Sequence, residues 1–294
     1  MPTRKFTVET RGGRQLEALE AGRPQGLPIL IHHGTPGCAA LPAATAAEAE
    51  ASGWRLITFS RAGYSASSRA PGRDVAQVVE DAAAIMDRLG IERFATWGVS
   101  GGGPHALACA ALMPDRVVAV SCLSGVAPYP AEGLDWFAGM GEANVQDFQR
   151  TISSDPAEVR AAIEQEAAEM RAATPEQLME QMSSVLSDED AALMRADVDN
   201  FVYLTMTGGL AAGADGLFDD TLAFTRPWGF EPGGIRVPTQ VWQGNQDLMV
   251  PFGHGRWLAQ RIPGAEAHLV PEHGHLTVLM RHLPEVHSWL AQRF

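Results

Sequence analysis

The sequence predicts an α/β protein in which a mainly parallel β-sheet carries helices on both faces and a helical segment is inserted. Three observations support this fold class. Short apolar runs alternate with helical stretches over residues 1–127, and the alternation returns over residues 235–294. Residues 128–234 are instead acidic, rich in methionine and helical in pattern. Alternating apolar strands and helices are typical of a parallel sheet that is buried on both sides.

The first part of the chain divides into clear elements. Residues 4–22 read as two strands joined at Gly12-Gly13, a hairpin. Residues 74–90 carry apolar side chains at helical spacing, and Gly90 stands where a C-terminal cap belongs. The remaining runs predict four buried strands: "LPILIHHG", "WRLITFS", "RFATWGV" and "RVVAVSCLSG".

The inserted segment has three marked helix starts. "SDPAEV" places a proline after a capping Asp155, "TPEQ" is a capping box, and "SDED" resembles one. Helices inserted at the carboxyl ends of parallel strands lie where ligands bind. We therefore expect residues 128–234 to form a lid on a core made of residues 1–127 and 235–294. The second part of that core predicts the strands "VPTQVWQG" and "AEAHLV" and the helices "FGHGRWLAQRI" and "LTVLMRHLPEVHSWLAQRF".

Composition limits the class of partner. The 294 residues carry a net charge of −13, which argues against nucleic acid and against an anionic membrane. No apolar run is long enough to span a bilayer, and the N-terminal residues lack the apolar core of a signal peptide, so we expect a cytoplasmic protein. Cys38, Cys109 and Cys122 are expected to be free thiols, and the absence of a Cys-x-x-Cys pair gives no indication of zinc. The oligomeric state is not indicated.

One short stretch concentrates the chemistry. In "WGVSGGGPHALACA", Ser100 stands between an apolar strand and an alanine-rich helix, and Gly98, Ser100 and Gly102 form Gly-x-Ser-x-Gly. At a strand-to-helix turn this pattern holds a nucleophilic serine in a strained backbone, and small neighbours prevent clashes. A phosphate-binding loop is the competing interpretation. It is disfavoured because the segment has neither Gly-Lys-[Ser/Thr] nor the Gly-x-Gly-x-x-Gly spacing.

A serine nucleophile needs donors for the oxyanion that forms during attack. The N–H of Gly101, at the start of the helix after Ser100, is one candidate donor. The tight turn "HHGTPG" after a buried strand leaves a second N–H free, which we assign to Thr35. His33 is expected to be structural, since its side chain is committed to this turn.

The nucleophile also needs a base and an orienting carboxylate. Asp247 follows the strand "VWQG" and is the carboxylate at its carboxyl end. His273 and His275 both follow the last strand. Gly274-His275 lies directly before an apolar helix, which favours His275 as the base. The remaining histidines fall on predicted helices or a strand and are interpreted as packing or surface residues.

Together these residues resemble the α/β-hydrolase superfamily. The likeness rests on "HHGTPG", "FSRAGYSASSR", "GVSGGGPHALACAALMPDRV", "GNQD" and "GHL", in the family's order. It is nearest to lidded hydrolases with a His-Gly-x-Pro-Gly turn, such as proline iminopeptidases and epoxide hydrolases. Two departures stand out. Ser60-Arg61 replaces the usual Asp-Arg, and Ser100 stands where an epoxide hydrolase has an aspartate nucleophile.

The resemblance and the residues together imply a serine hydrolase that needs no cofactor or metal. Ser100 would attack a carbonyl, His275 oriented by Asp247 would take its proton, and an acyl-enzyme would follow. Few basic residues occur in the predicted lid, so we expect a neutral, largely apolar ester, lactone or amide as substrate. Two alternatives stay open. The same residues can serve C–C bond cleavage or other triad chemistry such as perhydrolysis, and the chain can be a non-catalytic receptor with a hydrolase-like pocket.

Overall fold

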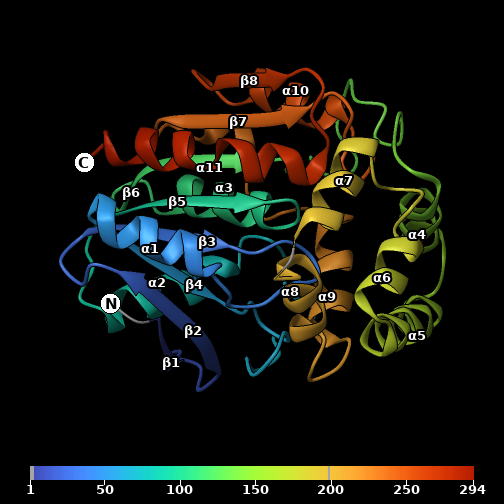
Figure 1. The fold of residues 1–294 in the computed structure, drawn as a ribbon, viewed down its shortest axis with the longest axis horizontal. Coiled ribbons are helices and arrows are strands. Elements are labelled where there is room, and N and C mark those ends of the chain that lie inside the picture. Colours follow the sequence, from blue (N-terminus) through green and yellow to red (C-terminus); the bar gives the residue numbers. More distant parts are fainter. Residues whose placement is uncertain (1–2, 198) are drawn as a thin grey trace.

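The computed structural model describes residues 3–197 and 199–294. Its eight-stranded sheet has the order β1-β2-β4-β3-β5-β6-β7-β8 (Figure 1). Strand β2 runs antiparallel to its neighbours β1 and β4, and every pair from β4 to β8 is parallel. The strands are β1 (Arg4–Glu9), β2 (Gln15–Gly22), β3 (Leu27–His32), β4 (Trp54–Phe59), β5 (Phe94–Val99), β6 (Val117–Leu123), β7 (Thr239–Gly244) and β8 (Glu266–Val270).

Helices cover the sheet on both faces because both faces of its strands are apolar. Along β3, Leu30 packs into one cluster, while Ile29 and Ile31 pack into the other, as the alternation of side chains along a strand requires. The first cluster is covered by α2 (Val78–Arg88), α3 (Gly102–Leu112) and α10 (Phe252–Arg261), and the second by α1 (Ala43–Ser52) and α11 (His275–Ala291). The predicted fold class is confirmed.

The predicted elements of the core are present with small shifts in their ends. The hairpin turns at Gly12-Gly13, and Gly90, with a φ of 67°, follows α2 as its left-handed residue. Helix α1 was missing from the prediction. It begins after Pro42 with no side-chain cap. Its sequence is mostly alanine, so no apolar stripe distinguishes one face of the helix from the other.

The inserted segment folds as α4 (Glu142–Ser153), α5 (Pro156–Ala172), α6 (Pro175–Gln181), α7 (Asp188–Ala196), α8 (Phe201–Gly209) and α9 (Asp215–Phe224), followed by a short 3-10 helix, η1 (Pro232–Gly234). The three marked helix starts are used: Asp155, Thr174 and Ser187 each accept a hydrogen bond from a backbone N–H of the first turn. Helices α4 to α9 gather at one end of the sheet, on the right in Figure 1.

Among the residues that the structure describes, none of the helices combines the length and the apolar character that a membrane crossing needs.

Candidate active site

Ser100 occupies the sharp turn between β5 and α3. Its φ of 55° lies in the left-handed region, which costs a residue other than glycine about 1–3 kcal/mol. The surrounding glycines make this turn sterically possible. A Cβ on Gly98 would lie 2.1 Å from the carbonyl oxygen of Gly102, and a Cβ on Gly102 would lie 2.2 Å from the carbonyl oxygen of His32. The expected steric reason for glycine on either side of the serine is therefore present.

Thr35 and Gly101 come together beside this turn. A Cβ on Gly101 would lie 2.2 Å from Oγ1 of Thr35, so the third glycine of the stretch is needed for this close approach. Both residues line the same cavity as Ser100. Within the described part of the chain, neither backbone N–H donates a hydrogen bond to another protein group. Two unused donors, of which that of Gly101 lies at the start of α3, can stabilise a developing negative charge.

Asp247 and His275 form a buried pair. The Nδ1 of His275 lies 2.8 Å from Oδ2 of Asp247, and the two residues are 2% and 3% exposed. Three further donors hold the carboxylate: Nε2 of Gln243 at 2.8 Å on Oδ2, and the backbone N–H groups of Met249 and Val250 at 2.9 Å on Oδ1. A carboxylate fixed in this way sets both the orientation of the imidazole and the tautomer with the proton on Nδ1.

Burial and charge act in opposite directions on His275. Burial alone lowers the pKa of its imidazole, but the charge of Asp247, its hydrogen bond and the charge of Asp190 raise it. The net effect places the pKa above its ordinary value of 6.5. The free Nε2 is then a stronger base than that of an isolated histidine.

Three other histidines, His273, His33 and His105, contact other partners. Nδ1 of His273 lies 2.8 Å from the carbonyl oxygen of Pro271, two positions earlier in the chain. His33 accepts a hydrogen bond from the backbone N–H of Arg61, at 3.0 Å, and its other nitrogen contacts the carbonyl oxygen of Gly34. His105 is buried in α3, and burial lowers its pKa to about 3. The structure thus brings His275, and not His273, to Asp247.

A buried ionic cluster that the sequence analysis missed lies beneath the Thr35 turn. Asp220 of α9 is fully buried and accepts hydrogen bonds from Thr35 Oγ1 at 2.8 Å, Tyr64 OH at 2.9 Å and Arg61 Nη2 at 2.7 Å. Arg73 adds a second ion pair at 2.6 Å. The arginines outweigh burial and hold the pKa of Asp220 well below its ordinary value. The carboxylate therefore ties the inserted helix α9 to the Thr35 turn.

The departure at Ser60-Arg61 leaves this cluster intact, because Arg61 keeps its carboxylate partner in Asp220. Ser60 accepts a hydrogen bond from the backbone N–H of Ala39 at 2.9 Å and donates one to Glu17 of β2 at 2.8 Å. A carboxylate therefore still lies beside this loop, supplied by a different strand.

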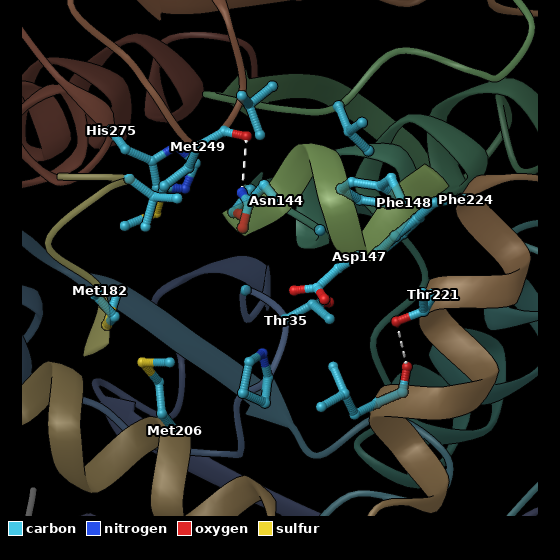
Figure 2. A pocket seen from close by; sticks show the side chains of 18 of the residues that line it. Thr35, Asn144, Asp147, Phe148, Met182, Met206, Thr221, Phe224, Met249 and His275 are labelled. Carbon is cyan, nitrogen blue, oxygen red and sulfur yellow. Dashed lines mark hydrogen bonds between the residues drawn. The ribbon is translucent and has the colours of Figure 1, made fainter. Parts of the chain in front are cut away.

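The cavity at Ser100 has a volume of about 290 Å³. It lies between the loops after β3, β5, β6 and β7 on one side and the inserted helices on the other. Most of its lining is apolar, with several methionines, among them Met182 and Met206 (Figure 2). Such a lining suits a substrate with a large apolar part.

Three charged side chains of the insertion also line the cavity. Asp147, which points into the open space in Figure 2, pairs with Arg150 at 3.0 Å. Glu166 is mostly buried, and burial together with the charge of Asp147 raises its pKa to about 7. Two carboxylates therefore share one arginine, and this end of the cavity is negative once Glu166 ionises.

Cys38, Cys109 and Cys122 are free thiols, as the sequence predicted. Burial raises the pKa of Cys109 and of Cys122 to about 12, so both are unreactive at neutral pH. Among the described residues, no group of three or more histidine, cysteine, aspartate or glutamate side chains is arranged to hold a metal ion.

The sheet order and the serine turn define an α/β-hydrolase-type enzyme. The chain belongs to the alpha/beta hydrolase fold family, whose sequence pattern matches residues 28–280, and the resemblance seen in the motifs is confirmed.

Relatives and a solved structure with named activities agree with this assignment. A probable proline iminopeptidase of Leptolyngbya boryana is 22% identical over 285 residues, covering 87% of this chain and 83% of that protein. A 2-hydroxy-6-oxononadienedioate/2-hydroxy-6-oxononatrienedioate hydrolase of Cupriavidus pinatubonensis is 28% identical over 199 residues, covering 65% of this chain and 58% of that protein. The solved structure of a thermophilic esterase from Thermogutta terrifontis superposes with a TM-score of 0.69 at 21% identity, over 99% of both chains.

Proposed function

We propose that the protein is a serine hydrolase that cleaves a neutral, largely apolar ester, lactone or amide through an acyl-enzyme on Ser100. The observation that carries this proposal is the buried 2.8 Å contact between His275 and Asp247, in a cavity that Ser100 also lines. A serine on a strained turn, an oriented imidazole and two unused N–H groups supply the nucleophile, the base and the oxyanion donors of acyl transfer.

The reaction would run in two halves. His275 Nε2 accepts the Ser100 hydroxyl proton as Oγ attacks the substrate carbonyl, and the N–H groups of Thr35 and Gly101 stabilise the oxyanion. The imidazolium then gives its proton to the leaving group, and the C–O or C–N bond breaks. Water, activated by the same imidazole, attacks the acyl carbon and releases Ser100. Asp247 stays ionised throughout and stabilises the imidazolium.

We further propose that residues 128–234 act as the lid of this site, on a core of residues 1–127 and 235–294. The insertion supplies most of the apolar lining and all three charged side chains of the cavity. Because those charges are two carboxylates and one arginine, the lid favours a neutral substrate over an anionic one. A dioate, such as the name of the Cupriavidus relative indicates, would need a cationic partner, and Arg150 is already paired with Asp147. Cleavage of a C–C bond in such a substrate is therefore the less supported alternative.

Substrate charge gives the direct test of this selectivity. We expect kcat/KM for a neutral aryl ester to exceed that for a carboxylate-bearing ester of matched size by about tenfold or more. The ratio should rise as the pH passes about 7, because Glu166 then becomes charged. Since both substrates need the same neutral His275, titration of that base cancels in the ratio.

The matched control for this test is Glu166→Gln, which keeps the shape of the side chain and should flatten the pH dependence of the ratio. A preference for the anionic ester that weakens with added salt would contradict the proposal. It would show instead that Arg150 forms an anion site.

A further inference from the structure

The helix that begins at His275 has an unusual cap. The first four N–H groups of a helix have no partner within it, and a polar residue just before the helix usually supplies one. Here the residue before α11 is Gly274, which has no side chain. Its own N–H is satisfied from within the helix, donating to Thr277 Oγ1 at 2.7 Å.

Asp190 of the inserted helix α7 satisfies the other three groups. Its Oδ2 accepts the backbone N–H of His275 at 2.7 Å, and its Oδ1 accepts those of Leu276 and Thr277 at 2.9 Å. The carboxylate is fully buried. The backbone of Asp190 is held as well, since its N–H donates to Ser187 Oγ at 3.1 Å.

The close packing explains the glycine before the histidine. A Cβ on Gly274 would lie 2.1 Å from Oδ2 of Asp190 and 2.2 Å from Oγ of Ser187. Glycine is thus required for the lid carboxylate to reach the helix start. The contact joins Asp190 and His275, which are 85 positions apart in the chain. It holds the backbone N–H of His275, whose imidazole contacts Asp247.

We propose that Asp190 is a positioning residue, which holds His275 against Asp247, so that the base is in place only when the inserted helices are docked on the core. The inference rests on the proposed role of His275 as the base. It assigns to α7 a part in proton transfer, in addition to the lining of the cavity.

The charges around His275 allow the two effects to be separated. In the described residues, Asp247 comes from the loop after β7 and Asp190 from α7, and both raise the pKa of the imidazole against burial. An ion pair between α7 and α11, Glu189 with Arg281 at 2.9 Å, lies on the exposed surface. Removing the charge of Asp190 should therefore lower the pKa of His275, whereas removing its oxygens should also loosen the backbone.

The test uses two variants and one control. Asp190→Asn keeps the shape and one acceptor oxygen, but it removes the charge and replaces the other oxygen by an NH2 group that faces a backbone N–H. Asp190→Ala removes every acceptor. Asp155→Asn is the control, because Asp155 also caps a helix of the insertion, at 2.8 Å from the N–H of Ala157, but is exposed and caps α5 instead of α11. The measurements are kcat and KM on a neutral aryl ester across pH, and the pKa of His275 from an NMR titration.

Asp190→Ala is expected to lower kcat by about 10- to 100-fold with KM nearly unchanged, because a displaced base slows proton transfer without changing the cavity. Asp190→Asn should move both the NMR pKa of His275 and the acid limb of kcat/KM to lower pH. Asp155→Asn should do neither.

An unchanged His275 pKa in Asp190→Asn would overturn the inference, as would a drop in kcat no greater than that of Asp155→Asn. If Asp190→Ala does not fold, the NMR titration of Asp190→Asn decides alone. That titration does not depend on turnover. A wild-type protein that hydrolyses none of the esters would therefore contradict the proposed function. The role of Asp190 in positioning His275 would still be decided by the pKa of His275 in Asp190→Asn.

Discussion

Ser100→Ala is expected to lower kcat for ester hydrolysis by about 1000-fold or more, and His275→Ala should lower it to a similar extent. The first variant removes the atom that forms the acyl bond. The second removes the imidazole that contacts Asp247 and that we propose takes the proton of Ser100. Because the two act as a unit, the double variant should be little worse than either single one. Steady-state kinetics on a neutral aryl ester, corrected for the uncatalysed rate, provide the measurement.

His273→Ala is the matched control, since it removes a histidine two positions away whose Nδ1 contacts the carbonyl oxygen of Pro271 and not Asp247. Its kcat should stay within a few-fold of the wild-type value. An inactive His273→Ala beside an active His275→Ala would mean that the base has been assigned to the wrong histidine.

Asp220→Ala is expected to lower the free energy of unfolding by about 3–5 kcal/mol, which is the largest stability effect predicted for a single side chain here. The substitution leaves the guanidinium groups of Arg61 and Arg73 almost fully buried without their counter-charge. It also removes the acceptor of the Thr35 hydroxyl, so the turn that carries Thr35 should loosen. Urea unfolding at neutral pH, followed by tryptophan fluorescence, measures the change.

Asp87→Ala gives the comparison for an exposed ion pair, because Asp87 pairs with Arg116 at 2.8 Å on the surface. That change should cost less than about 1 kcal/mol. If Asp220→Ala proved no more destabilising than Asp87→Ala, the buried cluster would not be what holds α9 to the core.

The sequence was sufficient for features whose chemistry is local. A strand, a serine and four small residues predict the turn at Ser100, because the steric demands of that turn fall within a few residues of it. The choice of His275 over His273 rested on its place before the last helix, and the structure brings that histidine to Asp247. The caps at Asp155 and Thr174 were equally readable, because each partner lies two or three positions away.

Features that depend on contacts between residues distant in the chain could not be predicted from the sequence. The "SDED" stretch predicts a cap for its own helix, and Ser187 does cap that helix. Asp190 of the same stretch instead caps α11, and nothing near it in the sequence signals a partner 85 residues away. Asp220 resembles any acidic residue of an amphipathic helix, although it is fully buried among arginines.

The other feature that the sequence did not predict is the start of helices that lack a marked cap. Helix α8 begins after Asn200 without a side-chain cap, and α9 begins after Ala214 in the same way. Their packing against the rest of the molecule, and not their local sequence, fixes where they start. Asp147 of α4 and Glu166 of α5 reach the cavity through the packing of the inserted helices against one another, which the local sequence does not specify. The sequence could therefore predict a poorly basic lid but not which of its charges face the substrate.

Reaction with a fluorophosphonate, followed by intact mass and peptide mapping, measures whether Ser100 is an activated nucleophile. We expect one phosphonyl group per chain, attached to Ser100, with fluoride released and labelling that slows as His275 becomes protonated at low pH. Ser100→Ala should remain unlabelled under the same conditions. A folded wild-type protein that takes up no label, or takes it up at another residue, would contradict the account and favour a non-catalytic receptor with a hydrolase-like pocket.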